Sequence, residues 1–485
     1  MTSAPAHPTD FDPAAAHPLY EQFRPAWELN RDFAEMHLHV LRGGRYLDAF
    51  GSGGEQAGEP PAQYAWRRNA ALALDGCCEL IHLRVDNLFR TPPARRFDDS
   101  PFADFLAEFL RNVDGAGTSI DAFMRRALVM HYVNGVDFVV DKQSPPAGAS
   151  PLTLAQERSL GLLPYLHAFG PLERLDWACD HGGGYRWVRY DLGAAAADDE
   201  THATSGERRY LTLTSDQWRL YRVSGEGEDR SVTVASGPIA LGRCPVVPFY
   251  YKESVRSDYP KVPLSLLTRI APIARYLLNL LSQVQIDVYR NIAFLVATGV
   301  EADKIPAEIT PMGCWALPAG SQIHNISGDV AHIQAKIELA RTLVEAILRI
   351  GKLTGAAGEL RGRATSGVQV AVERTDLDNE MRMTAAQLEQ VERELIHLAV
   401  CRYKGQRVPV EQVRYDVEYN KKYVLTGADE LIAQARELVS MGLHRDDGAP
   451  ALLKILLRKV LDALAGEDDK AYADALSQIE AASFA

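Results

Sequence analysis

The sequence has little cysteine and no long apolar run. Its six cysteines among 485 residues are scattered, and none forms a CxxC pair that would suggest a zinc site. We therefore expect free thiols, a reducing compartment and no structural metal. The best candidate for a membrane span, 264–281, is interrupted by Arg269, Pro272 and Arg275. The first 13 residues also lack the basic and apolar regions of a secretory signal.

The motifs of common enzymes are also missing. His181-Gly-Gly-Gly184 is similar to an esterase oxyanion segment, but no Gly-x-Ser-x-Gly elbow accompanies it, so a glycine turn explains it better. No GxxxxGK[ST] loop occurs, so an ATPase would have to be a partner. His37 and His39 are two residues apart, which turns them away from each other on a helix. We expect no enzyme activity, no cofactor and no bound metal.

The formal net charge of the chain is −12. Its composition, with 47% apolar and 24% charged residues, is typical of a globular protein. A chain of this length can bury large cores, and the length predicts two or three lobes. A protein that grips DNA is usually basic. An acidic protein can still surround DNA and let it slide. Each contact to a phosphate adds affinity for DNA, so a protein with few such contacts does not hold the DNA in place.

The first half of the chain predicts helices and then a sheet. Apolar spacing indicates helices over 20–47, 63–90, 101–113 and 118–134, followed by a buried strand at 136–141. From 164 to 252 apolar residues recur at every second position. This alternation predicts antiparallel strands at 185–190, 210–214, 217–223, 231–235 and 245–250. The Ala/Asp/Thr-rich piece 193–206 predicts a flexible hairpin tip between two of these strands.

Two amphipathic rods are expected next. The first, 263–293, has its apolar stripe at Leu267, Ile270, Ala274, Leu277, Leu281, Val284 and Val288. The second, 332–353, has its stripe at Ile333, Ile337, Ala340, Val344 and Ile347. These stripes favour packing within and between subunits over a ligand groove. The segment between the rods, 294–331, predicts brief strands at Cys314–Leu317 and Gln322–Ile326.

A glycine-rich basic loop, 354–367, joins the second rod to a long helix at 368–404. Arg361 and Arg363, with Lys352 behind them, are the candidate contacts to DNA; the alternative is that they are solvated surface charges. The acidic residues Glu373, Asp376, Asp378 and Glu380 either line a tunnel or form an exposed helical face. Beyond them, 413–424 predicts a strand that returns to the earlier sheet, and 427–485 predicts helices.

In this order the chain resembles the portal proteins of tailed bacteriophages, and the likeness of order covers nearly all of it. The opening helices end in Val85-Asp-Asn-Leu-Phe-Arg-Thr-Pro-Pro93, and Val136-Asp-Phe-Val-Val-Asp141 follows the next ones. Pro245-Val-Val-Pro-Phe249 precedes the first rod, and Thr365-Ser-Gly-Val-Gln-Val370 leads into the long helix.

The resemblance implies an α+β, mostly helical subunit in a ring of about twelve copies. It assigns the ranges as follows: a wing (1–262 with the returning strands 405–426 and the long helix 368–404), a stem (263–293 and 332–353), a clip (294–331), a tunnel loop (354–367) and a crown (427–485).

By the same resemblance, the ring sits at a capsid vertex of the virion and forms in the host cytoplasm, away from membranes. It passes double-stranded DNA during packaging and ejection. Its partners would be the large terminase ATPase, the major capsid and scaffolding proteins, and a neck or tail adaptor. The alternatives are another head-to-tail connector, a capsid-associated structural protein, or a hydrolase that uses the sheet at 164–252.

Overall fold

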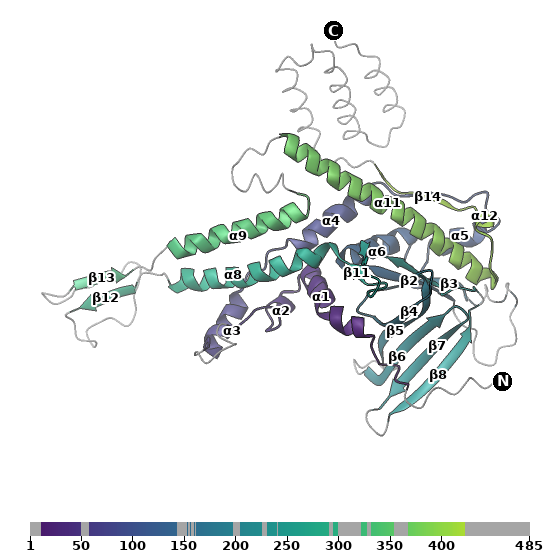
Figure 1. The fold of residues 1–485 in the computed structure, drawn as a ribbon, viewed down its shortest axis with the longest axis horizontal. Coiled ribbons are helices and arrows are strands. Elements are labelled where there is room, and N and C mark those ends of the chain that lie inside the picture. The colour runs from purple at the N-terminus through teal and green to yellow at the C-terminus, as the bar shows by residue number, and fades with distance from the viewer. Residues whose placement is uncertain are drawn as a thin grey trace, which may run out of the picture.

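A pair of long helices projects from a body of helices and sheets (Figure 1). In the computed structural model the described residues are 11–49, 58–142, 153, 156, 160, 162–196, 204–225, 230–239, 241–290, 294–298, 322–326, 331–353 and 367–421. None of the helices in these ranges is long and apolar enough to cross a membrane.

Four helices open the described chain: α1 (Pro18–Glu35), α2 (Leu38–Leu41), α3 (Pro61–Ala70) and α4 (Cys77–Leu88). The single helices predicted over 20–47 and 63–90 are therefore wrong. The first is broken at Met36, which ends α1 with a left-handed backbone at φ 54°. The second is broken before α4, where the Asp75 carboxylate accepts a hydrogen bond from the Cys78 amide at 3.0 Å. The N-cap residue itself is Gly76, so this hydrogen bond to the first turn comes from the residue before the cap.

The next two helices lead into the sheets. They are α5 (Ala103–Phe109), shorter than the predicted 101–113, and α6 (Ile120–Val133), as predicted. The Ser119 hydroxyl caps α6, and the chain leaves that helix through Gly135 at φ 86°. A Cβ on Gly135 would lie 2.7 Å from a ring carbon of Tyr250, so glycine allows this close approach.

Two antiparallel sheets form the rest of the body. The first has the order β3 (Pro164–Phe169), β2 (Val136–Lys142), β9 (Val246–Phe249). The second is a meander in the order β4 (Arg174–Cys179), β5 (Tyr185–Ala196), β6 (Thr204–Thr214), β7 (Gln217–Ser224), β8 (Ser231–Pro238). The predicted strands are confirmed, but the hairpin tip expected at 193–206 is partly wrong. Ala194 pairs with Arg208 and Ala196 with Thr204, so β5 and β6 continue into it.

The first rod begins later than predicted. Its expected first turns are occupied by β11 (Pro263–Leu264), which pairs with β10 (Lys252–Glu253), and by the 3-10 turn η2 (Leu266–Arg269); α8 (Ala271–Arg290) follows. A capping box between Ser265 and Thr268 starts this turn. Pro272 lies in the first turn of α8, where its missing amide hydrogen costs little.

The second rod, α9 (Ala331–Ile350), lies against α8 as predicted. A hairpin of β12 (Phe294–Thr298) and β13 (Gln322–Ile326) connects the two at their far end (Figure 1). The strand at Gln322–Ile326 is therefore confirmed, whereas the one predicted at Cys314–Leu317 lies outside the described residues.

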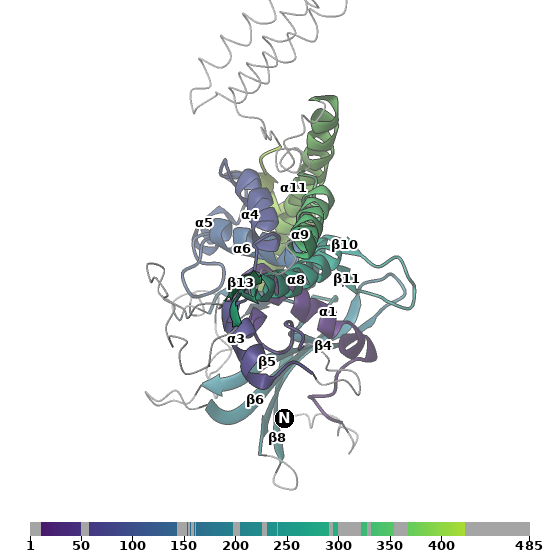
Figure 2. The ribbon, with the colours of Figure 1, turned by 90° about the vertical axis from the view of Figure 1, so that its left-hand side faces the viewer.

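The longest helix, α11 (Gly367–Lys404), crosses the body and packs on β2, β9 and α4. Its predicted apolar face is buried, with every one of these side chains at most 8% exposed: Leu377, Met381, Leu388, Val391, Leu395 and Leu398. Figure 2, which looks along the projecting helices, shows α11 and α4 on one side of them and the five-stranded sheet on the other.

The chain then passes through α12 (Val410–Val413) to β14 (Asp416–Glu418). The strand predicted at 413–424 does not join the earlier sheet, because β14 pairs with β1 (Ala94–Arg96) instead. Arg393 of α11 holds Asp416 at 2.8 Å and keeps β14 beside the long helix. The helices predicted over 427–485 lie outside the described residues.

Candidate functional site

Of the three candidate DNA contacts, only Lys352 lies among the described residues. Arg361 and Arg363 lie outside them, but the helices on both sides of their segment are described. Lys352 follows the last turn of α9 with a left-handed backbone at φ 58°. Its ammonium group lies 2.7 Å from the Glu380 carboxylate and 3.3 Å from the Asp376 carbonyl oxygen, both on α11. The charge of Lys352 is thus paired within the chain, and its contact with DNA stays a prediction.

Glu380 is the centre of a cluster that joins α4, the end of α9 and α11. We call Arg84, Gly351, Lys352 and Glu380 the loop-base cluster. The Arg84 side chain is fully buried; its Nε lies 3.4 Å from Glu380, and its Nη2 donates to the Gly351 carbonyl at 2.9 Å. An arginine at the carboxyl end of a helix also suits the helix dipole. One side chain of α4 therefore holds α9 and α11 together.

Electrostatics explains why Glu380 stays charged there. Burial raises the pKa of its carboxyl, but Arg84 and Lys352 outweigh this effect, and the pKa is lowered overall. Burial and the neighbouring Glu380 in turn raise the pKa of Tyr251. Glu380 was expected on a tunnel wall or an exposed helical face; it is instead largely buried, while Asp376 is exposed.

Close packing fixes the end of α9 as firmly as the charges do. A Cβ on Gly351 would lie 2.5 Å from a methyl carbon of Leu80, and one on Gly76 would lie 3.2 Å from Ile347. The last turn of α9 therefore lies directly on α4, and a side chain at Gly351 would force Leu80 to move. The chain is thus held in place at Gly351, just before the loop begins.

The base of the stem has a second buried ion pair. Arg67 of α3 and Glu59 lie 2.7 Å apart with both side chains fully buried. Arg67 also donates to the Ser282 hydroxyl on α8 at 3.0 Å and to the Asp48 carbonyl at 2.5 Å. Further along, Lys336 of α9 reaches Asp287 of α8 at 2.6 Å. The two rods are thus joined to each other and to the body.

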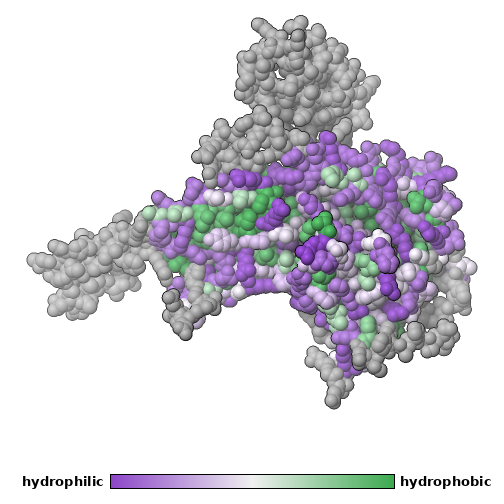
Figure 3. Space-filling model, in the orientation of Figure 1, coloured by the Kyte–Doolittle hydropathy of each residue, from purple (hydrophilic) through white to green (hydrophobic). Residues whose placement is uncertain are grey.

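The rods leave apolar side chains in solvent. Tyr276 and Val288 of α8 are 55% and 54% exposed, and Leu339 and Ile337 of α9 are 40% and 38% exposed. Figure 3 shows hydrophobic surface along these helices. The predicted stripes are therefore only partly internal: Leu277, Ala340 and Ile347 are buried, whereas Val288 and Ile337 are not.

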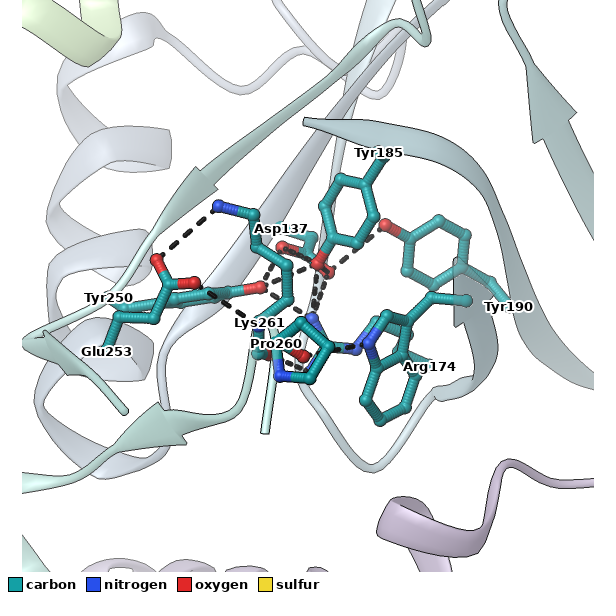
Figure 4. A network of polar contacts seen from close by, with 9 residues as sticks. Asp137, Arg174, Tyr185, Tyr190, Tyr250, Glu253, Pro260 and Lys261 are labelled. Carbon is teal, nitrogen blue, oxygen red and sulfur yellow. Dashed lines mark hydrogen bonds and ion pairs between the residues drawn. The ribbon is translucent and has the colours of Figure 1, made fainter. Parts of the chain in front are cut away.

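A third polar cluster joins the two sheets and was missed by the sequence reasoning (Figure 4). Asp137 of β2 and Arg174 of β4 form a buried ion pair at 3.2 Å. The hydroxyl groups of Tyr185, Tyr190 and Tyr250 all donate to the Asp137 carboxylate. Burial, and Asp137 close by, raise the pKa of each tyrosine well above its usual value. The sequence did contain one signal of this cluster, because Asp137 is an acidic residue in the middle of an apolar strand.

The other motifs have structural roles. Gly182 and Gly184 donate their amides to the Asp180 carboxylate at 2.9 and 2.8 Å, so the predicted glycine turn before β5 is confirmed. The rings of His37 and His39 lie 5.8 Å apart. In the described part of the chain no three His, Cys, Asp or Glu residues are grouped as a metal site would need.

Comparisons with known proteins give little. No model of a known protein family matches the sequence, and no curated protein matches it. A chain in the structure of the neck of an empty gene transfer agent particle, computed with C6 symmetry, is 11% identical at a TM-score of 0.38, over 88% of this chain and 96% of that one. A chain in the virion of a native gene transfer agent particle is 12% identical at a TM-score of 0.34, over 83% and 96%. We draw no conclusion about function from scores this low.

Proposed function

We propose that this chain is a portal-type subunit, about twelve copies of which surround a channel for double-stranded DNA. The observation that carries the proposal is the projecting pair α8 and α9. Each helix has 20 residues and extends about 30 Å. The pair ends in the β12–β13 hairpin, and at its other end the loop-base cluster ties Gly351 and Lys352 to α4 and α11.

The exposed apolar residues of the rods support assembly. A single subunit would leave Tyr276, Val288, Ile337 and Leu339 in water, and Figure 3 shows apolar surface along the rods, which is the kind of surface that marks an interface. Copies arranged around an axis would cover these residues with the next subunit. Each rod pair would then form one segment of a channel wall.

Charge supports a channel that does not grip its cargo. The chain is acidic overall at −12, and an acidic wall repels the DNA backbone. Arg361 and Arg363 would give a few salt-sensitive contacts from a loop whose base is fixed. Lys352 would serve first to hold that base, because Glu380 already pairs with it.

The remaining parts of the proposal follow from the resemblance alone. The ring would stand at a capsid vertex, dock the large terminase ATPase and later a neck or tail adaptor, and contact the major capsid and scaffolding proteins. Should rings form without any effect on DNA, another connector or a capsid-associated structural protein would become the better description.

The experiment that tests this function is a mass measurement on the purified chain under native conditions. A closed ring of about twelve copies is the expected result. A monomer or dimer at micromolar concentration would contradict the proposal.

A further inference from the structure

A cavity of about 970 Å³ lies between the two sheets and the helices α1 and α6. Its floor is the face of the five-stranded sheet that bears Leu211 of β6 and Leu220 of β7, which lie directly opposite each other. Phe169 of β3 forms a wall of the cavity and stacks on Tyr190 of β5 at 4.4 Å. Clefts that hold small ligands have volumes of about 300–1,000 Å³. The cavity is therefore large enough for a small molecule, and all of its lining residues are described.

Much of the lining is apolar. The apolar side chains are those of Met130, Ala168, Phe169, Leu172, Leu192, Leu211, Trp218 and Leu220. The floor has few backbone groups to offer, because β5, β6 and β7 each pair with a strand on both sides. On the edge strand β3, the Leu166 amide already donates to the Val113 carbonyl at 2.6 Å. A peptide in the cavity would leave amides of its own unpaired, so a ligand with few polar groups fits better.

Two arginines lie next to the leucine pair on the same face of the sheet. Arg209 of β6 is directly opposite Arg222 of β7, and like charges in this arrangement destabilise a sheet. The Nε atom of Arg209 is buried and makes no hydrogen bond to any described residue. Glu207, two residues earlier on that face, forms no ion pair with either arginine. An anion beside Arg209 would satisfy its Nε and reduce the repulsion.

The charges that line the cavity also favour an anion. Three of the four acidic lining residues have an arginine within 3.0 Å: Asp141 with Arg402, Asp191 with Arg208, and Glu28 with Arg24. The fourth, Glu173, is exposed. In contrast, Arg126 of α6 and Arg209 both line the cavity without an acidic partner in the described part of the chain. Positive charge therefore prevails over the one acid that is left.

We propose that this cavity binds an anionic amphiphile, a small molecule with an apolar body and one carboxylate, sulfonate or phosphate group. The apolar body would lie on Leu211, Leu220 and Trp218. The anionic group would accept a hydrogen bond from Nε of Arg209, and such charge-assisted hydrogen bonds are stronger than neutral ones. The site lies on the body rather than on the rods, so it does not depend on the proposed channel.

A brominated fatty acid tests the site on the whole chain. Decanoate with a terminal bromine is added below its micelle concentration. Bromine quenches tryptophan fluorescence at contact, and Trp218 lines the cavity, so we expect saturable quenching and, by calorimetry, one ligand per chain. Trp218→Phe should keep the calorimetric binding and lose most of the quenching. Decanol has the same alkyl chain without the charge, and it should bind about tenfold or more weakly.

Substitution of Arg209 tests the contact with the anion. Arg209→Gln should weaken the binding of decanoate about tenfold or more and leave the binding of decanol unchanged. Its thermal midpoint without ligand should be no lower than that of the wild type, because the removed charge faces Arg222 and has no partner. The matched control is Arg219→Gln. Arg219 precedes Leu220 on β7 and lies on the other face of the sheet, so this variant should bind as the wild type does.

Three results would overturn the proposal. Equal binding of decanol and decanoate would leave the arginines without a role. Quenching that Trp218→Phe does not reduce would place the ligand outside the cavity. The third result is no binding of decanoate up to millimolar concentration. If the peptide acetyl-Leu-Glu-Phe-Leu-Glu-amide then binds, and Arg209→Gln abolishes that binding, the occupant is an acidic protein segment instead.

Discussion

The Nη2 atom of Arg84 lies 2.9 Å from the carbonyl oxygen of Gly351, which ties α4 to the end of α9. The same guanidinium faces Glu380 of α11, so one buried side chain sets the separation of the helices on both sides of the loop. The position of α11 relative to α9 thus depends on a residue almost three hundred positions away from Glu380 in the chain.

Replacing Arg84 with methionine should destabilise the subunit strongly. The variant leaves the buried Glu380 carboxylate with Lys352 alone and orphans the Gly351 carbonyl, and breaking a buried pair costs about 3–5 kcal/mol. Urea denaturation followed by tryptophan fluorescence measures the change. The control is Arg125→Gln, which breaks the half-exposed pair with Asp86 and should cost at most about 1 kcal/mol. Equal effects of the two variants would refute the role given to Arg84.

Stability should depend on pH through His131. This side chain is completely buried against Phe249, and burial lowers its pKa from 6.5 to about 3. Between these values the unfolded chain binds a proton that the folded chain does not. His131 therefore lowers the free energy of unfolding by about 1.4 kcal/mol per pH unit as the pH falls from 6.5.

His131→Phe should remove this part of the pH dependence. A phenyl ring would still pack on Phe249, and it cannot bind a proton. Urea midpoints at pH 7, 6, 5 and 4 give the slope. His82→Gln, at an exposed histidine, is the control and should keep the wild-type slope. A His131→Phe slope equal to that of the wild type would show that His131 is not held neutral.

Assembly should depend on the exposed side of the stem. Leu277 is 2% exposed, so Leu277→Asp would unfold the subunit rather than report on contacts between subunits. Tyr276→Asp, at a side chain 55% exposed, should leave the thermal midpoint unchanged and prevent rings in size-exclusion chromatography. Val255→Asp is the matched control at a fully exposed apolar residue and should assemble normally. Normal rings from Tyr276→Asp would place the interface elsewhere.

The loop arginines should matter for DNA and not for assembly. Arg361→Glu with Arg363→Glu should leave rings intact but impair the packaging or retention of DNA, because repulsion replaces the phosphate contacts. Arg111→Glu with Arg256→Glu makes the same change in net charge on the surface of the body and should package normally. Packaging by the loop variant at the control level would remove the proposed contact.

Periodicity predicted the parts of the fold that local sequence determines. The face of α11 from Leu377 to Leu398, the position of α9 and the strands β5 to β8 of the meander follow from the spacing of apolar residues, whereas β4 was not predicted. The start of α4 was missed, although Asp75 and Gly76 were available as a cap and a break. The pairing of β14 with β1 was not predictable, because three residues of strand carry no information about their partner.

The candidate site was predicted only in outline. Lys352 was proposed as a DNA contact, which stays a prediction, and its ion pair with Glu380 of α11 was not foreseen. Arg84 and Asp137 were not identified, since their partners come from other elements brought together by packing. A buried charge shows in the sequence only as a polar residue within an apolar run, as Asp137 does.

An image of the purified particle along its symmetry axis tests the central claim most directly. We expect a closed ring with a central bore, α8 and α9 of every copy in its wall, and residues 354–366 facing the bore at the level of the Arg84–Glu380 pair. A solitary subunit without a bore, or a ring with these residues on its outer surface, would contradict the account.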